Sequence, residues 1–331
     1  MAETRLTNVI VPDIFTAYTL ERSIYRSRLW MSGIIQDNPG ITGLLNGGGT
    51  TFNLPFWQDI SGTSGDNPSE TVAQTVNPIT AGQEIARRQF RTKAWGQNAI
   101  AATNAGTAPL TAIEARVINY WAQAYDLIGI ATVQGVIADN IANDSGDLVN
   151  DISSATVTVF NDDGVIDTQA LLGENGTIGR PDQTDFAAIV VHPATYALMR
   201  KQDLIDFVPV SDQERPIELY MNMRVVVDRN APVSSNVYDT YIFKPGAIVW
   251  GLGTANYEAT ELDRVPLQGF GIDQLITRRV FAIHPVGFQW TNTTVSDGIT
   301  PTDAELQLAV NWDRVYQQEN AGFVMFRHRL T

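Results

Sequence analysis

The sequence predicts an α+β protein in which one very long helix joins an extended ribbon to a compact α/β layer. Three observations give this prediction. Residues 109–143 have the hydrophobic spacing of a single helix, residues 50–100 read as two extended strands around a polar tip, and residues 186–250 combine short apolar strands with a helix. Elements segregated in this way are typical of the α+β class.

The helix predicted over residues 109–143 has a regular hydrophobic face. Apolar or small residues recur there at spacings of three and four: Ile113, Val117, Tyr120, Ala124, Ile128, Ala131 and Gly135. Thr111 and Glu114 fit a capping box, in which each side chain accepts a backbone N–H that the first turn leaves unpaired. We therefore expect the helix to begin close to Pro109.

The second half of this helix is predicted to be buried on several sides. No residue between Asp126 and Asp139 is charged. Gly129 and Gly135 each weaken a helix by about 1 kcal/mol relative to alanine, so we expect another segment to pack closely against them.

Two N-terminal segments lack the pattern of a core. Residues 1–48 read as an extended arm that ends in a flexible break at 47–49 (Gly-Gly-Gly). Residues 50–100 read as one hairpin, with an outgoing strand at 51–57, a polar tip at 62–80 and a returning strand at 84–101. A two-stranded ribbon is marginal by itself in water, and the sequence shows no obvious partner for it within the chain.

The remainder of the chain supplies the α/β layer and the closing elements. The expected strands lie at 155–160, 186–191, 224–228, 237–243, 248–250, 273–283 and 322–329, and the expected short helices at 168–172, 193–203 and 303–310. The run 186–191 is continuously apolar, which is typical of a fully buried strand, and Pro193 is well suited to the first position of the helix that follows.

Composition excludes several classes of function. The chain has 331 residues, a formal net charge of −14 and no cysteine. Disulfides, thiolate metal sites and cysteine catalysis are therefore excluded, and the only concentration of bases, Arg87, Arg88, Arg91 and Lys93, is too small for tight, sequence-specific DNA binding. We also expect no signal peptide and no membrane span, because no apolar run approaches the length needed to cross a bilayer.

We predict no catalytic, cofactor-binding or metal-binding residues. The glycine-rich stretch 43–49 lacks the lysine and hydroxyl of a phosphate-binding loop. His192, His284 and His328 have no neighbours at metal-ligand spacing, and the acidic stretch 144–185 lacks the register of a calcium loop. Structural roles are the better interpretation for all of them. The arm and the ribbon cannot be stable alone, which instead indicates a subunit completed by copies of itself.

Several motifs, taken in order, resemble those of tailed-bacteriophage major capsid proteins of the HK97-like fold. The run 190–198 (Val-Val-His-Pro-Ala-Thr-Tyr-Ala-Leu) is similar to a strand–helix motif of that family, and 225–232 (Val-Val-Val-Asp-Arg-Asn-Ala-Pro) to one of its strands. The run 166–173 resembles one of its helices, although Glu174 stands where aspartate is common. The closing segments 284–290 (His-Pro-Val-Gly-Phe-Gln-Trp) and 301–312 also resemble the family, so the likeness covers most of the chain.

The resemblance implies a name for each part of the chain. It implies an N-arm at 1–48, an extended E-loop hairpin at 49–100 and a peripheral domain with its spine helix at 101–144. The α/β axial domain would occupy 145–270, the return to the peripheral domain 271–300, and a C-terminal extension 301–331.

Two departures from the family refine the expectation. Crosslinked members carry a lysine near the E-loop tip, whereas residues 62–83 contain none and Lys93 lies towards the base, so we expect a shell without covalent crosslinks. The arm begins almost at Met1, which leaves no room for a fused scaffolding segment, so we expect a separate scaffolding protein.

The predicted function is that of a major capsid protein, located in the virion, that forms an icosahedral shell around double-stranded DNA. Its expected partners are other copies of itself in pentamers and hexamers, a portal and a decoration protein, with no membrane and no sequence-specific contact to DNA. An encapsulin-type nanocompartment that binds cargo enzymes is the alternative with the same fold, and an α/β hydrolase is the alternative of a different class. The residues predicted to lie at assembly interfaces are Phe52, Trp57, Arg87, Arg88, Arg91, Arg22 and Arg26.

Overall fold

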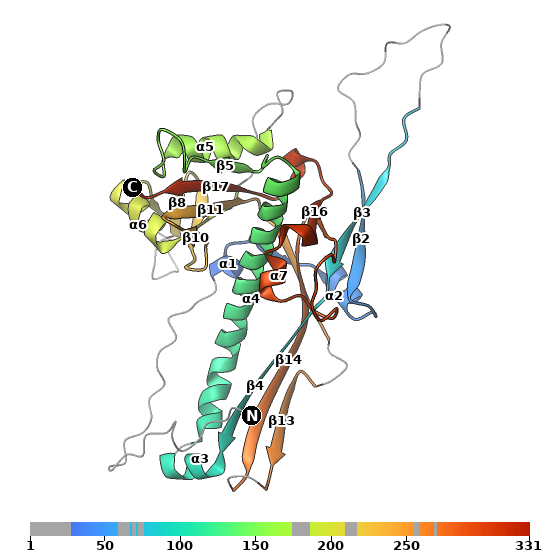
Figure 1. The fold of residues 1–331 in the computed structure, drawn as a ribbon, viewed down its shortest axis with the longest axis vertical. Coiled ribbons are helices and arrows are strands. Elements are labelled where there is room, and N and C mark those ends of the chain that lie inside the picture. Colours follow the sequence, from blue (N-terminus) through green and yellow to red (C-terminus); the bar gives the residue numbers. More distant parts are fainter. Residues whose placement is uncertain are drawn as a thin grey trace.

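The computed structural model confirms the mixed α+β architecture (Figure 1). It describes residues 28–58, 67, 71, 76–106, 108–173, 186–208, 217–254, 258–267 and 270–331. Helix α4 (Pro109–Asn143) is the long rod, and one sheet lies beside each of its halves. A ribbon made of strands β2 (Thr51–Trp57) and β3 (Ala81–Arg87) projects away from the rod.

An eight-stranded sheet forms the α/β layer. Its path is β5 (Val149–Asp151), β17 (Phe323–Arg329), β11 (Val237–Phe243), β6 (Ala188–Val191), β9 (Met223–Val227), β8 (Ile217–Tyr220) and β7 (Asp206–Val208), with β10 (Val233–Ser234) on β11. All of β6 is buried, as its apolar run predicts. Helices α5 (Asp162–Ala170) and α6 (Pro193–Lys201) pack beside this sheet, and Pro193 begins α6 as expected.

The C-terminal strand, which the sequence predicts at 322–329, is present and is an inner strand of this sheet; the assignment of 301–331 as a C-terminal extension stays a prediction. Strand β17 pairs antiparallel with β11 over seven residues and parallel with β5. Its residues Phe323 to Phe326 are fully buried. Burying four consecutive large side chains favours the middle of a sheet over an appended segment, since each contributes roughly 1.5–3 kcal/mol.

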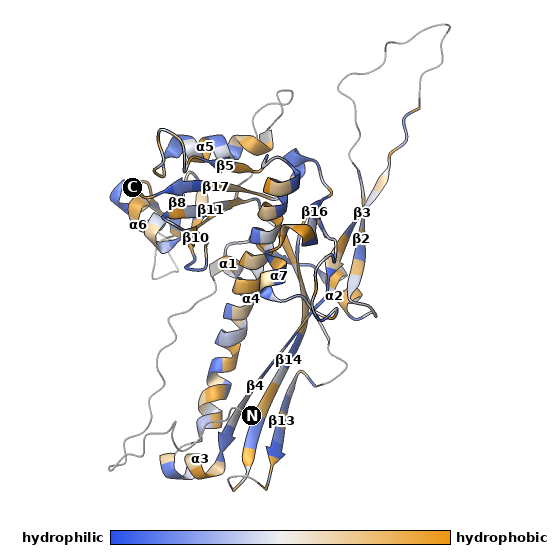
Figure 2. Ribbon diagram, in the orientation of Figure 1, coloured by the Kyte–Doolittle hydropathy of each residue, from blue (hydrophilic) through white to orange (hydrophobic). Residues whose placement is uncertain are grey.

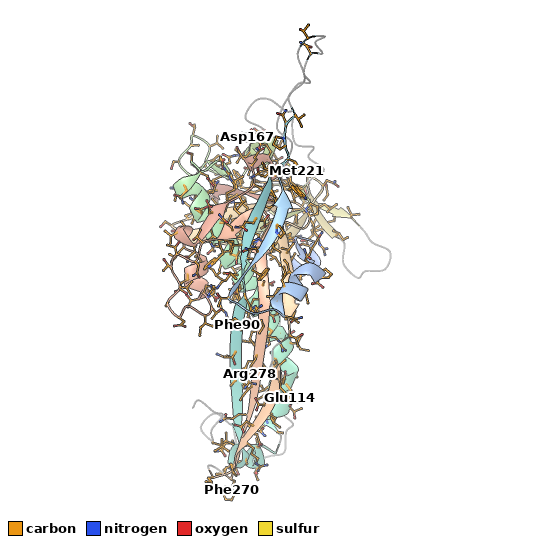
Figure 3. The ribbon with its side chains drawn as sticks, turned by 90° about the vertical axis from the view of Figure 1, so that its right-hand side faces the viewer. Phe90, Glu114, Asp167, Met221, Phe270 and Arg278 are labelled. Carbon is orange, nitrogen blue, oxygen red and sulfur yellow. The ribbon has the colours of Figure 1, made fainter. Side chains whose placement is uncertain are left out.

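The second sheet follows the first half of α4. Strand β14 (Ile272–Pro285) lies at its centre and pairs with β12 (Ile248–Gly253), β13 (Thr260–Val265) and β4 (Gln89–Asn98), and β1 (Ile35–Asp37) pairs with β12. Figure 3 shows these strands running lengthwise, with Phe90 near the middle and Phe270 at the far end. Short elements complete the described fold: α1 (Arg28–Met31), α2 (Pro39–Leu45), α3 (Ala99–Ala105), η2 (Leu171–Gly173), β15 (Phe288–Trp290), α7 (Asp303–Leu306), η4 (Ala309–Asn311), β16 (Trp312–Arg314) and η5 (Gln318–Asn320).

The predicted hairpin over 50–100 is in fact two structures. Strand β3 pairs with β2, but the chain breaks at Arg88 and continues as β4, which pairs with β14 over ten residues. The returning strand therefore does have a partner within the chain. A second prediction, a strand at 155–160, is also wrong: Val159 forms only an isolated bridge to Arg329.

Helix α4 spans the predicted residues, but its start differs from the capping box. The N-cap is Ala108, which makes no side-chain cap, and Pro109 occupies the first turn. Because proline begins the helix before Thr111 can cap it, another group must satisfy the free N–H groups. The Gln97 side-chain oxygen accepts the Leu110 N–H at 2.8 Å.

The second half of α4 is enclosed, as expected, and Gly135 is the point of closest approach. A Cβ atom built on Gly135 would collide with the backbone oxygen of Leu306 and would lie 2.5 Å from Trp312 Nε1. That indole donates to the same Leu306 oxygen at 2.8 Å, so neither group can move aside. At Gly129 the nearest atom, Leu29 Cδ2, is 3.8 Å from such a Cβ, which is ordinary contact. The expected close neighbour thus exists at Gly135 and not at Gly129.

These two glycines make a matched pair of test positions. We expect Gly135→Ala to lower the unfolding free energy by several kcal/mol, because the 303–312 segment would have to leave the helix. We expect Gly129→Ala to raise it by about 1 kcal/mol through helix propensity alone. Chemical denaturation of both variants measures the difference, and equal effects would contradict the packing described.

Candidate assembly surfaces

The β2–β3 ribbon has a buried root and an exposed far end. At the root, Phe52 packs with Ala86, Ile41, Leu45 and Ala282 in a small core of its own. At the far end, Trp57 stands opposite Ala81 and is 70% exposed. Hydrophobic and hydrophilic residues are mixed along this ribbon (Figure 2). The ribbon therefore has an apolar anchor at its root and an exposed tryptophan at its far end.

A buried polar chain fixes the direction of the ribbon. Glu84 of β3 lies 2.8 Å from His284 Nε2 of β14, and both side chains are almost fully buried. The Tyr316 hydroxyl donates to the same carboxylate, and burial together with this bond raises the pKa of Tyr316 to about 12. The Phe56 ring packs edge-on against Tyr316, with 4.7 Å between ring centroids. His284 thus has the structural role that its sequence context predicts.

Two of the predicted interface arginines are used inside the subunit. Arg87 donates to Asn292 Oδ1 at 2.8 Å and to the backbone oxygens of Gly298 and Ile299. Arg88 donates to the backbone oxygens of Leu44 and Gly47. Burial lowers the pKa of both guanidinium groups. Phe52, Arg87 and Arg88 are thus all buried within the single subunit, and their place at an assembly interface stays a prediction.

The other predicted interface residues have mixed outcomes. Arg91 donates to Asp303 at 3.0 Å and to Thr300, but it is partly exposed. Arg22 and Arg26 lie outside the described residues. Trp57 is the predicted residue with the exposure that an interface requires.

A second apolar surface was not found by sequence reasoning. Helix α4 and strand β4 form a groove of about 300 Å³ lined by Trp95, Ala112, Ile113, Arg116, Val117 and Tyr120. The spacing of Ile113, Val117 and Tyr120 predicts that they share one face of the helix. That the first half of this face is only partly covered becomes clear from the pairing of β4 with β14.

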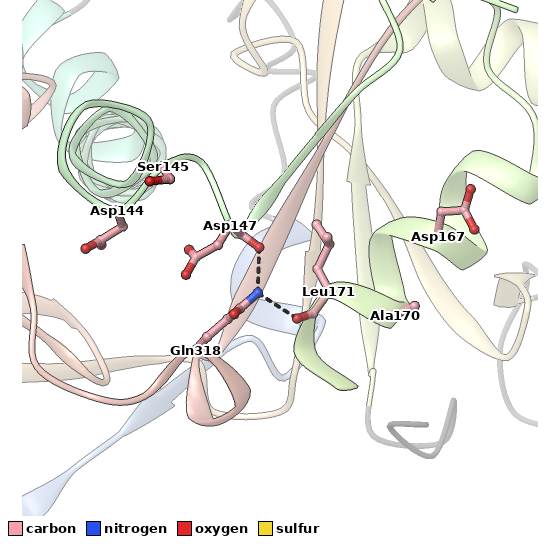
Figure 4. Close-up of a pocket in the computed structure, with 7 residues that line it drawn as sticks. All are labelled: Asp144, Ser145, Asp147, Asp167, Ala170, Leu171 and Gln318. Atoms are coloured by element: carbon pink, nitrogen blue, oxygen red, sulfur yellow. Dashed lines mark hydrogen bonds between the residues drawn. The ribbon is translucent and has the colours of Figure 1, made fainter. Parts of the chain in front are cut away.

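A second hollow is lined by acidic residues, and polar groups around it already pair with one another. It measures about 530 Å³ and lies where α4 ends, opposite α5 (Figure 4). The Gln318 amide crosses it, donating to the backbone oxygens of Asp147 and Leu171. Arg314 pairs with Asp147 at 2.7 Å. Among the described residues no cluster of three metal-ligating side chains occurs, and none of the helices described is long and apolar enough to cross a membrane.

The histidines also have structural partners. His192 caps α6, its Nδ1 accepting the Ala194 N–H at 3.2 Å, and burial lowers its pKa. His328 is fully buried, with Nε2 3.1 Å from the Thr240 hydroxyl and Nδ1 3.2 Å from the Arg329 oxygen. Burial lowers the pKa of His328 to about 4.

A long rod with one sheet beside each of its halves, a projecting ribbon and exposed apolar surfaces together define a shell-forming subunit of the HK97-like fold. The structure resembles the cyanophage Pam1 capsid asymmetric unit, with a TM-score of 0.58, 11% identity and coverage of 96% of this chain and 97% of that one. It also resembles an encapsulin complex from Synechococcus elongatus, with a TM-score of 0.52, 6% identity and coverage of 96% and 94%. No family model matches the chain.

Sequence similarity favours the first of these two kinds of shell, the phage capsid. The chain is 34% identical to the major capsid protein of Bacillus phage SPP1, over 100% of this chain and 99% of that protein. The chain belongs to the major capsid proteins of tailed bacteriophages, and its place is the capsid of the virion.

Phe52 and Trp57 lie in one strand and are expected to respond differently to truncation. Phe52→Ala should lower the unfolding free energy by about 3 kcal/mol, because it empties the core at the ribbon root. Trp57→Ala should leave that free energy within about 0.5 kcal/mol and should reduce particle yield. Denaturation and particle counts on both variants test this. A large loss of subunit stability from Trp57→Ala would show that its ring is buried in the isolated chain.

The pKa of His328 predicts an acid-sensitive fold. Because the folded-state pKa of about 4 lies below the ordinary histidine pKa of 6.5, the stabilisation is complete above pH 6.5 and is lost as the pH falls towards 4. His328→Gln keeps a hydrogen-bonding side chain without a titrating group. Between pH 7 and pH 4 its unfolding free energy should fall less than that of the wild type, by on the order of 3 kcal/mol. Identical pH profiles would show that His328 does not carry the effect.

Proposed function

We propose that this major capsid protein forms an icosahedral shell of pentamers and hexamers around double-stranded DNA, held by non-covalent contacts. The observation that supports this best is the ribbon, which is fixed to the body by Glu84, His284 and Tyr316 while Trp57 at its far end is 70% exposed. Such an end becomes buried when it lies over a neighbouring subunit. Many moderate contacts of this kind, closed by symmetry, make a stable shell.

We further propose that each part of the chain has the role that the family resemblance implies. Residues 49–100 serve as the E-loop, of which 51–87 include the ribbon and 89–98 belong to the second sheet. Residues 1–48 serve as an N-arm, of which the described part packs on its own subunit, since β1 pairs with β12 and α2 contributes Ile41 and Leu45 to the core at the ribbon root. Residues 101–144 with 271–300 serve as the peripheral domain, and residues 145–270 as the axial domain around the five- and six-fold axes. Strand β17 adds to the sheet of the axial domain, whereas β12 and β13 of the range 145–270 pair in the second sheet beside α4.

We propose that the shell has no covalent crosslinks, and the positions of the lysines support this. The chain contains Lys93, Lys201 and Lys244 and no lysine between 58 and 83. Lys93 lies in β4, and its Nζ sits over the Tyr120 ring of the same chain at 6.0 Å from the centroid. Neither strand of the ribbon, nor the connection between them, therefore contains a lysine side chain that could form a crosslink.

We also propose that the role of the whole chain is structural and not enzymatic.

The further partners in this proposal are a separate scaffolding protein, a portal and a decoration protein. The net charge of −14 favours weak or repulsive contact with DNA, which suits a container that is filled and emptied. An encapsulin-type compartment has the same fold and is the second candidate, but full-length similarity to a phage major capsid protein favours the virion.

Negative-stain microscopy of the expressed chain, with and without the products of neighbouring genes, tests this function. We expect closed, uniform shells when the scaffold is present, and a single band at the monomer mass when purified shells are boiled in detergent. A ladder of covalent oligomers would contradict the non-covalent shell. Uniform shells that contain an enzyme and no DNA would favour the encapsulin alternative.

A further inference from the structure

Helix α6 has a histidine ring as its N-cap. His192 directly follows β6, and Pro193 begins the helix. The Nδ1 atom of His192 accepts the backbone N–H of Ala194 at 3.2 Å. The common N-cap residues are Ser, Thr, Asn and Asp, whose side-chain oxygens still accept a hydrogen bond in mild acid. A histidine caps a helix only while the accepting nitrogen carries no proton, because both ring nitrogens of the charged form are donors.

The first turn of α6 depends on this ring. Pro193 has no N–H to donate, and the first bond within the helix runs from the Tyr196 N–H to the His192 backbone oxygen at 3.0 Å. A proton on Nδ1 would set a second donor against the Ala194 N–H. It would also place a positive charge at the positive end of the helix dipole. Both effects favour opening of the first turn.

The groups that face His192 are a carboxylate and a tyrosine ring. Asp228 directly follows β9 and is buried, and its Oδ1 accepts the Asn230 N–H at 2.8 Å. The centroid of the Tyr238 ring lies 5.3 Å from that of the imidazole, and His328 stacks on Tyr238 at 6.1 Å. Two histidine rings and one carboxylate therefore lie around the Tyr238 side of the cap.

These surroundings set the direction of the pH effect. Burial lowers the pKa of His192, and the charge of Asp228 opposes this shift. The folded helix therefore holds the neutral ring at pH 7, and the stability that this form confers is lost as the pH falls below the ordinary histidine pKa of 6.5. Burial raises the pKa of Asp228, so protonation of that carboxyl has the opposite sign and adds stability as the pH falls.

Helix α6 supports one corner of the eight-stranded sheet (Figure 1). The Tyr196 hydroxyl, one turn from the cap, donates to Glu218 of β8 at 2.8 Å. The Arg200 guanidinium lies over the Tyr196 ring at 5.9 Å and over the Phe207 ring of β7 at 5.7 Å. Strand β7 ends the path of this sheet, and Phe207 is 48% exposed. Opening of the first turn of α6 would therefore weaken the support of the β7–β8 corner.

We propose that His192 is a pH-sensitive cap, whose protonation opens the first turn of α6 and loosens the β7–β8 corner of the eight-stranded sheet. This device belongs to the single subunit and goes beyond the proposed shell function. It is separate from the buried His328, which lies within β17.

NMR and amide hydrogen exchange on the unassembled, full-length chain test the cap. The chain has three histidines, so replacing each in turn assigns its imidazole signal and allows the titration of His192 to be followed directly. The exchange rate divided by the intrinsic rate at the same pH reports opening of the α6 backbone. His192→Asn supplies a cap that does not titrate, and His192→Ala supplies none. His328→Gln is the matched control that removes a different histidine.

Between pH 7 and pH 4 we expect the protection of residues 196–201 to fall about fivefold further in the wild type than in His192→Asn, which is the contribution of one N-cap. His192→Ala should have low protection already at pH 7, and His328→Gln should keep the loss seen in the wild type. The cap is not a switch if His192→Asn loses as much protection as the wild type, or if the wild type loses none while the His192 signal titrates. A His192 signal that stays in its neutral position down to pH 4 would also overturn the proposal.

Discussion

The close packing of the 303–312 segment against the second half of α4 is the constraint on which the rest of the subunit depends. At Gly135 the helix backbone meets Leu306 and Trp312 so tightly that no side chain fits between them. This contact brings the C-terminal segment back onto the rod, and from there β17 enters the middle of the eight-stranded sheet. The two sheets and the rod consequently share one hydrophobic core, which includes residues from α4, β12, β14 and β17.

The rigidity of this body gives the ribbon its function. A two-stranded ribbon alone is marginally stable, so its direction has to be set at the root. Phe52 supplies apolar burial there, and Glu84 links β3 to His284 and Tyr316. A buried ionisable pair contributes little net stability unless it is fully hydrogen-bonded, but breaking it is costly, so it specifies geometry more than it adds free energy. The root therefore holds the exposed end in a defined position, where a neighbour can bury it.

Local sequence patterns predicted a helix or strand well where hydrophobic residues recur regularly along the element. The spacing of three and four predicted α4 from Pro109 to Asn143, the apolar run predicted β6, and the motif order predicted the capsid fold. The errors concern pairings between distant segments. Arg87 and Arg88 read as a basic surface, because nothing near them in sequence shows that carbonyl groups of residues 44–47 and 298–299 surround them. The groove was missed for the same reason, since β4 is brought beside α4 by its pairing with the distant strand β14.

The body of the subunit is folded before assembly, whereas we propose that the ribbon end becomes buried only against a sister molecule. Amide hydrogen exchange on the unassembled subunit and on purified shells measures this directly. We predict slow exchange over residues 128–140 of α4 in both states, and fast exchange around Trp57 and Ala81 that becomes slow only in shells. If the ribbon end is protected as strongly in the unassembled subunit as in shells, a sister molecule is not what buries it.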